Sequence, residues 1–233
     1  MTTAKKTVKK TAKKVTKTTA KKLLRAHNAR VAKDNAAFAK LPPAEKRVAI
    51  ARDVLAQLST GRLQATPGVW LQGNENNQVQ ACDLDSELKD LLGKMKTCEG
   101  CLIGGVFMCA VEKADKLKLR DLEEHRNMCD CSSCDDEEKP LDVSEADAFK
   151  YLKKFFSEKQ LAMMECAFER GDGAASPSDI GDELFDQCQE FANDIEEPKE
   201  RMRLVMENVI LNKGTFRPNK KPVQMYVTPG FTG

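Results

Sequence analysis

The sequence has few of the residues on which most enzyme active sites depend. Of its 233 residues, two are histidine, two are tyrosine and one is tryptophan. His27 lies in a lysine-rich segment and His125 lies in the charged run Glu-Glu-His-Arg, so neither is placed for a Ser-His-Asp triad or a metal-dependent hydrolase. No glycine-rich loop ends in Lys-Ser/Thr, and Gly171-Asp-Gly173 lacks the alternating acids of an EF-hand loop. These absences favour a protein that is not an enzyme.

Long hydrophobic runs are also missing. The most apolar segment, Leu102–Val111, has ten residues without a charge. A bilayer requires about 20 such residues, so this segment is predicted to be a buried helix. Glycine inside a helix costs about 1 kcal/mol relative to alanine, so the pair Gly104-Gly105 indicates that another backbone packs closely there.

No apolar segment follows the basic N-terminal residues, as a secretory signal would require. The nine cysteines, an odd number in a chain without that signal, indicate free thiols or metal ligands and not a disulfide framework. We therefore expect a cytoplasmic protein without a membrane partner, in the host cell cytoplasm or a virion if the protein comes from a phage.

Residues 1–40 form a strongly basic arm. They contain 13 lysines and arginines and one acid, Asp34, a net charge of +12, whereas the remaining 193 residues hold 25 bases and 35 acids, a net −10. Close variants of Thr-Ala-Lys-Lys repeat through the first 22 residues, a low-complexity pattern typical of disorder in water. On a helix this spacing places lysines along one face, where they repel unless an anion neutralises them. We expect an arm that is disordered, or helical when an anion is bound.

Nucleic-acid phosphate is the anion that best suits this arm, because its neutralisation releases counterions and gives sequence-independent binding. No aromatic residue precedes Phe38, so the arm has no platform for base stacking. Its composition is similar to the lysine-rich tails of linker histones and of bacterial and phage histone-like proteins. A merely solubilising tail and attachment to a membrane surface are the alternatives. The residues expected to contact phosphate are Lys5, Lys6, Lys9, Lys10, Lys13, Lys14, Lys17, Lys21, Lys22 and Arg25.

Beyond the arm, the sequence predicts a mainly α-helical body with a minor β component at residues 41–217 and an irregular tail at 218–233. Pro43 and Gly61 are placed to begin and end a first helix. The turn signal Thr66-Pro-Gly68, flanked by apolar residues, predicts a short β-hairpin at residues 62–72. Further helices are expected at about 86–95, from 102 toward 122, and at 145–156, 157–171, 181–195 and 198–212, with an edge strand at 223–227. Ser144 is the expected N-cap of one helix, and Ser157 with Gln160 the capping box of the next.

Two cysteine pairs, Cys98-x-x-Cys101 and Cys131-x-x-Cys134, have the spacing of metal ligands. Together they provide the four ligands of a tetrahedral structural zinc ion, and the acids between Asp130 and Glu138 favour a cation. Two alternatives stay open, free thiols without metal and a redox dithiol with a thiolate at a helix N-terminus. The redox pattern needs a strand immediately before Cys98, where the sequence predicts a helix. The zinc ligands of this hypothesis are Cys98, Cys101, Cys131 and Cys134, with Cys129 or His125 as substitutes.

Three other cysteines, Cys109, Cys166 and Cys188, fall on apolar helix faces and are predicted to pack in the core. The single tryptophan, Trp70, is predicted to pack against the body and not to bind a ligand.

Four segments carry a resemblance to known proteins: 47–54 (RVAIARDV), 101–105 (CLIGG), 151–161 (YLKKFFSEKQL) and 201–216 (RMRLVMENVILNKGTF). With these segments the chain resembles proteins of tailed phages and bacteria over about residues 44–217. The resemblance implies a phage origin and carries no assigned activity.

The sequence thus favours a non-enzymatic, phage-type protein whose arm binds nucleic acid and whose acidic body contacts an unknown protein partner. The main alternative is a virion component whose arm faces packaged DNA. A cysteine-dependent enzyme is the third hypothesis, and it requires a reactive thiol at Cys98 or Cys101.

Overall fold

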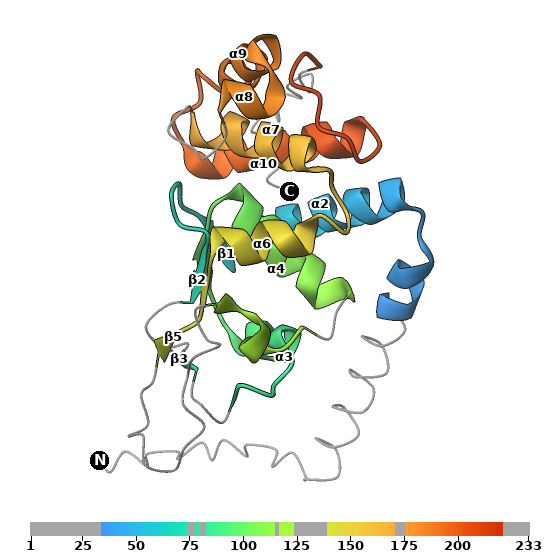
Figure 1. Cartoon of the computed structure of the whole chain (residues 1–233), viewed down its shortest axis with the longest axis vertical. Helices are drawn as coiled ribbons and strands as arrows, with labels where there is room; N and C mark the ends of the chain where they lie inside the picture. Colours follow the sequence, from blue (N-terminus) through green and yellow to red (C-terminus); the bar gives the residue numbers. More distant parts are fainter. Residues whose placement is uncertain are drawn as a thin grey trace, which may run out of the picture. The chain divides into compact units, whose positions relative to one another are not determined.

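The structure, a computed structural model, describes residues 34–73, 78–79, 83–114, 117–123, 139–170 and 176–220. The chain divides into two units, Met1–Ala37 and Phe38–Gly233, of which the second is the body (Figure 1). The lysine repeat and the expected strand at 223–227 lie outside the described residues, so their predicted conformations stay predictions. Within the described ranges no helix has both the length and the apolar character needed to cross a membrane.

The body is mostly helical and has a small four-stranded sheet, which confirms the predicted fold class. Its α-helices are α2 (Pro43–Thr60), α3 (Leu88–Lys94), α4 (Leu102–Ala114), α6 (Glu145–Leu152), α7 (Glu158–Glu169), α8 (Pro177–Ile180), α9 (Asp182–Phe191) and α10 (Pro198–Leu211). A 3₁₀ turn covers Leu119–Asp121.

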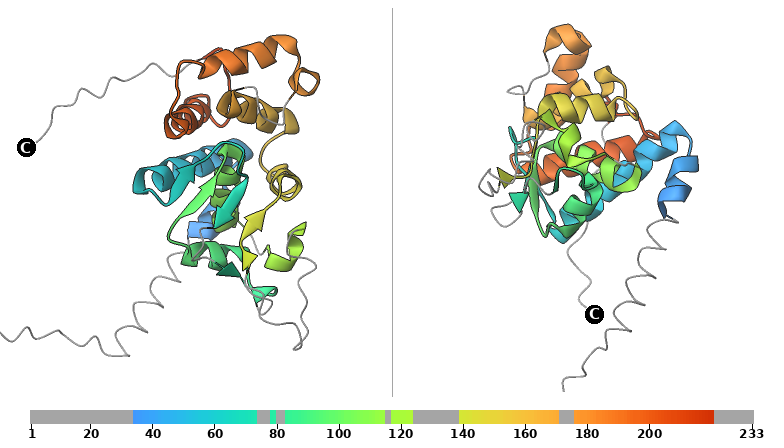
Figure 2. Two further views of the ribbon diagram at one scale, coloured as in Figure 1. Left: turned by 90° about the vertical axis from the view of Figure 1, so that its left-hand side faces the viewer. Right: turned by 60° about the horizontal axis from the view of Figure 1, so that its bottom comes forward.

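Helix α4 is the centre of the core, as its apolar sequence predicts. All ten residues from Leu102 to Val111 are buried, and the helix contacts α2, α3, α6 and α7 as well as strands of the sheet (Figure 2). Gly104 and Gly105 explain how the sheet comes so close to α4. A Cβ on Gly104 would overlap the carbonyl oxygen of Trp70, and one on Gly105 would lie 2.6 Å from Leu63 Cδ2. The predicted close approach of a second backbone is therefore confirmed at Gly104.

The sheet has the strand order β1 (Leu63–Ala65), β4 (Cys98–Gly100), β2 (Leu71–Gly73) and β6 (Asp142–Val143). Strand β4 runs parallel to β1 and antiparallel to β2 and separates them, so the predicted hairpin of residues 62–72 is wrong. The turn itself exists, because the Val69 N–H donates to the Thr66 carbonyl at 3.4 Å. A second sheet pairs β3 (Gln78–Val79) with β5 (Lys139–Pro140).

Capping residues set several helix ends as the sequence predicts. Gly61 adopts a left-handed φ of 73° and ends α2, and Ser144 accepts a hydrogen bond from the Asp147 N–H at the start of α6. Ser157 likewise accepts from the Gln160 N–H at 3.3 Å, which is half of the predicted capping box. The other half is wrong, because the Gln160 side chain instead binds the backbone of Phe216, accepting from its N–H at 2.6 Å and donating to its carbonyl at 3.2 Å.

Three helices end at least four residues earlier than the sequence predicts, and one of them is α6, which ends at Leu152 and not at Phe156. Helix α4 ends at Ala114 and not near Leu122, because the chain returns at Leu117, whose carbonyl accepts the Leu88 N–H at 2.6 Å. The helix expected to reach Ile195 ends at Phe191. The carbonyls of residues 195 and 196, beyond this end, accept hydrogen bonds from the Arg201 guanidinium at 3.1 and 2.6 Å.

Candidate functional site

The Cys98-x-x-Cys101 pair lies where strand β4 leads into helix α4. Cys98 opens the strand and Cys101 directly precedes the helix, and both are buried as free thiols. The Cys101 Sγ accepts the N–H of Gly104 at 3.5 Å, three residues on, so this thiol occupies the position of a helix N-cap. The strand that a redox motif needs before Cys98 is not found there. Residues 95–97 are irregular, and β4 begins only at Cys98 itself.

Burial controls the acidity of both thiols. It raises the pKa of Cys98 to about 11, although the nearby Arg62 guanidinium acts in the opposite direction. Burial also raises the pKa of Cys101 to about 12, against the hydrogen bond from the Gly104 amide. Catalytic and redox-active cysteines have pKa values at or below about 7.5 because the thiolate is the nucleophile. Both thiols are therefore protonated at neutral pH, and their environment does not suit a redox dithiol.

The two sulfur atoms have different neighbours. Cys98 Sγ lies 3.7 Å from Met95 Sδ, whereas Cys101 Sγ lies 3.8 Å from the Trp70 carbonyl oxygen. Nowhere in the described residues do three or more histidine, cysteine or acidic side chains gather as a metal site would require. The remaining zinc ligands of the hypothesis, Cys129, Cys131, Cys134 and His125, lie outside the described residues, so the zinc site stays a prediction.

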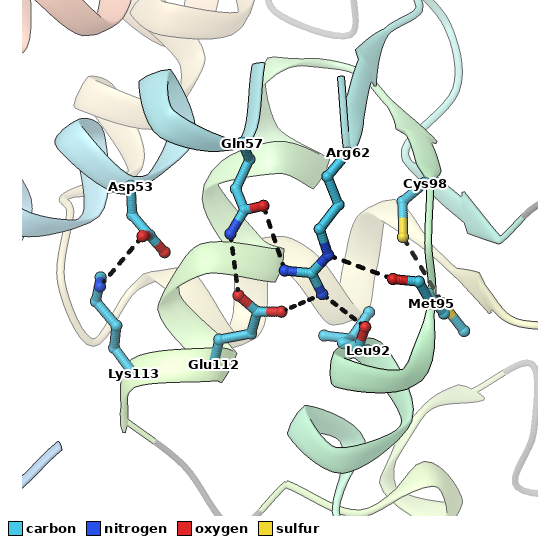
Figure 3. A network of polar contacts seen from close by, with 8 residues as sticks. All are labelled: Asp53, Gln57, Arg62, Leu92, Met95, Cys98, Glu112 and Lys113. Atoms are coloured by element: carbon cyan, nitrogen blue, oxygen red, sulfur yellow. Dashed lines mark hydrogen bonds and ion pairs between the residues drawn. The ribbon is translucent and has the colours of Figure 1, made fainter. Parts of the chain in front are cut away.

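A polar network centred on Arg62 lies beside Cys98 and ties three helices together (Figure 3). The Arg62 guanidinium forms an ion pair with Glu112 of α4 at 2.6 Å and donates to the Leu92 carbonyl at the end of α3, also at 2.6 Å. Gln57 of α2 joins both charged groups, with distances of 3.3 Å to Arg62 and 3.5 Å to Glu112. Sequence analysis missed this network, since its two charged residues, Arg62 and Glu112, lie 50 positions apart in the chain and its other members are neutral groups.

The network is a structural device. Arg62 also donates to the Met95 carbonyl at 3.4 Å, so it joins the Met95 N–H, which binds the Leu92 carbonyl at 3.0 Å, in satisfying carbonyls at the end of α3. Burial disfavours the charged guanidinium, but the hydrogen bond and the charge of Glu112 outweigh it, so the pKa of Arg62 lies above its ordinary value. Arg62 is permanently charged and has no proton to transfer, and four of its five N–H donors bind groups of the body. This arrangement holds α2, α3 and α4 in place.

The three cysteines predicted to pack in the core are all buried. The Cys166 thiol of α7 donates to the Phe185 carbonyl at 3.9 Å, and its interaction with the Cys188 thiol of α9 lowers the pKa of Cys166 and raises that of Cys188. Trp70 packs edge-on against Phe149 with ring centroids 5.7 Å apart, as predicted for a packing residue. The phosphate-binding residues predicted in the arm, Lys5 to Arg25, lie outside the described residues.

No protein-family model, curated protein or solved structure matches this chain. The resemblance to phage and bacterial proteins therefore stays a prediction, and function must be argued from the residues themselves.

Proposed function

We propose that this chain is a non-enzymatic protein of phage type whose basic arm binds nucleic acid without sequence preference and whose helical body contacts other proteins. One observation carries the proposal: residues 1–40 have a net charge of +12 and the other 193 residues a net charge of −10. Such a separation concentrates phosphate affinity at one end of the chain and leaves a body whose overall charge suits protein partners better than polyanions. The host cell cytoplasm, where DNA and RNA are both accessible, is the proposed compartment.

The chemistry of the body supports this interpretation over that of a cysteine-dependent enzyme. Cys98 and Cys101 are the thiols on which such an enzyme would depend, and burial keeps both protonated at neutral pH. The ion pair of Arg62 and Glu112 beside Cys98 is engaged in holding helices together. These contacts indicate that Arg62 and Glu112, the polar groups at the centre of the fold, stabilise it. Groups that bind a partner are therefore expected at the surface of the body and in the arm.

Duplex DNA binding measured across a salt series tests the proposal. In the full chain, ten of the arm's 13 basic residues are replaced by glutamine: Lys5, Lys6, Lys9, Lys10, Lys13, Lys14, Lys17, Lys21, Lys22 and Arg25. Each phosphate contact contributes about −0.9 to the slope of log K against log salt, so the loss of ten contacts reduces the slope by up to about 9. The affinity in dilute salt should fall by several orders of magnitude.

The matched control is a chain in which the order of residues 2–22 is scrambled at constant composition. Binding that depends on charge alone keeps its affinity and slope in this control, and it is equal for two duplexes of unrelated sequence. Wild-type affinity in the glutamine variant would refute the proposal. Loss of binding in the scrambled chain would refute its electrostatic mechanism.

A further inference from the structure

The body is acidic overall, yet three of its segments meet in a strongly basic region. Arg47, in the first turns of α2, donates from Nε to the Gly214 carbonyl at 2.5 Å and from a terminal nitrogen to the Phe155 carbonyl at 3.0 Å. It thereby joins α2 to the connection between α6 and α7 and to the turn that follows α10. Figure 1 shows the α6–α7 connection passing beside α2.

Further contacts lock the same three segments together. The side chain of Gln160 holds the backbone of Phe216 through two hydrogen bonds, and the ring of Phe38 packs against Phe155 with centroids 6.1 Å apart. Gly214 packs so closely on the Ala44 carbonyl that a side chain there would clash with it. Residues 38–47, 150–160 and 212–220 are therefore one contiguous region of the body, which we call the basic face.

The charges of the basic face are almost all positive. It holds ten bases and two acids, Glu45 and Glu158, a net charge of +8, whereas residues 176–200 hold nine acids and one base. Eight of the ten basic side chains are exposed: Lys40, Lys150, Lys153, Lys154, Lys159, Lys213, Arg217 and Lys220. Charge in this body is thus segregated by region and not mixed, as it would be on a surface that serves solubility alone.

Helix stabilisation explains only part of this charge. Lys153, Lys154 and Lys213 follow the ends of α6 and α10, where a cation complements the negative end of the helix dipole. Lys159 does the opposite, since it lies in the first turn of α7, next to the positive end of the dipole. Lys46 is likewise near the start of α2, and it lies 6.0 Å from the ring centroid of Phe38. Lys46 thus has a partner in the Phe38 ring and Lys153 forms an ion pair with Glu158, whereas helix stabilisation does not account for Lys159.

The chemistry of the basic face fits the phosphate backbone of a duplex. The aromatic rings in it are engaged inside the body: Tyr151 is buried against Phe107 and Phe155, and Phe38 is buried against Phe155. Splayed single-stranded bases stack on exposed rings, whereas duplex backbones need only convergent cations. No base-reading group is required for such a contact, so it is independent of sequence.

We propose that the basic face is a second nucleic-acid site, which binds the phosphates of a duplex independently of the arm. The proposal rests on the proposed function for its class of ligand, and it places part of the binding on the folded body. A second site and an arm that acts alone predict different results. If the basic face binds duplex, a chain whose arm charges are removed keeps a residual, salt-dependent affinity for the duplex.

The test uses the full chain and a 30-base-pair duplex in a salt series. The face variant carries Lys46→Gln, Lys159→Gln and Lys220→Gln, one lysine from each segment and none from residues 1–40. The matched control carries Lys94→Gln, Lys96→Gln and Lys199→Gln, three exposed lysines outside the face with the same loss of charge. The arm-neutralised chain described above is the third protein, and circular dichroism confirms that all of them are folded.

The face variant is expected to lower the slope of log K against log salt by about 1 to 3 and the affinity at least about tenfold, while the control leaves both unchanged. An equal loss in the control would show an effect of net charge and would overturn the site. Unchanged binding in the face variant, with loss in the arm-neutralised chain, would overturn the site and leave the arm function intact. The reverse pattern would support the site and refute the arm.

Discussion

The glycine pair in α4 gives the most direct test of the core, because the two positions differ in what a methyl group would meet. On Gly104 the added Cβ overlaps the Trp70 carbonyl oxygen, a backbone atom that moves only if the strand region moves with it. On Gly105 it lies 2.6 Å from Leu63 Cδ2, the end of a side chain that can change rotamer. Gly93 in α3 is the control, since nothing lies within 4 Å of a Cβ there.

Each substitution by alanine combines two effects of opposite sign. Alanine favours the helix by about 0.5–1 kcal/mol at every position, and an overpacked core loses about 1–3 kcal/mol or more. Gly93→Ala should therefore stabilise the protein by about 0.5–1 kcal/mol. Gly105→Ala should destabilise it by about 1–2 kcal/mol, and Gly104→Ala by at least about 3 kcal/mol, because backbone cannot give way as a side chain does.

Urea unfolding followed by circular dichroism and by the fluorescence of Trp70 measures all three free energies of unfolding. Trp70 is the only tryptophan and its own carbonyl receives the clash, so its emission should also shift in folded Gly104→Ala. The order Gly93, Gly105, Gly104, from stabilised to most destabilised, is the expected result. A free energy for Gly104→Ala within about 1 kcal/mol of the wild type would show that the Trp70 backbone does not lie against α4.

Two further predictions concern the polar centre of the body. Arg62→Met should destabilise the protein by about 1–3 kcal/mol in urea unfolding, because it leaves the half-buried Glu112 without its ion-pair partner. Adding Glu112→Leu should recover part of that loss. If the free-energy changes of the two single variants simply add in the double variant, the pairing is contradicted. Burial raises the pKa of Cys98 to about 11 and that of Cys101 to about 12, so the unfolded chain loses these protons near pH 9 while the folded chain keeps them. Their contribution to stability is thus complete below about pH 9 and is lost as the pH rises toward 11–12. In Cys98→Ala the free energy of unfolding should fall by about 3 kcal/mol less over this alkaline range than in the wild type. Curves of unfolding free energy against pH that run parallel for the two proteins between pH 8 and 11 would refute this prediction.

Local chemistry made the helices predictable from the sequence. Pro43 and Gly61 bound α2 through φ preferences that need no knowledge of the rest of the chain, and Ser144 caps α6 in the same way. The close approach at Gly104 was predictable too, since a glycine weakens a helix and its place in an apolar run therefore indicates a packed backbone.

Non-local pairing accounts for what was missed. Strand β4 lies between β1 and β2 in the sheet, although it follows β2 by more than twenty residues in the chain. A strand of three residues shows too little alternation of apolar and polar side chains to indicate which strand it pairs with. For Gln160 two partners compete, the N-cap that its spacing predicts and the Phe216 backbone that only the folded chain brings near. Tertiary contact prevails, because the Phe216 backbone provides both a donor and an acceptor at hydrogen-bonding distance and the N-cap provides one donor.

The basic face shows why net charge is a poor guide to what a folded chain binds. Its ten bases come from three segments more than a hundred residues apart at the extremes, and each segment alone has the charge of an ordinary helix end. At 0.1 M salt a charge acts over about 10 Å, so a phosphate at this face responds mainly to nearby lysines, and the acids of more distant regions are screened. Arg47 makes this possible without contacting any phosphate itself, since its hydrogen bonds to Gly214 and Phe155 bring the three segments together. The unit Phe38–Gly233 has 26 bases and 35 acids, a net charge of −9, and it can still bind a polyanion where its fold gathers cations in one region.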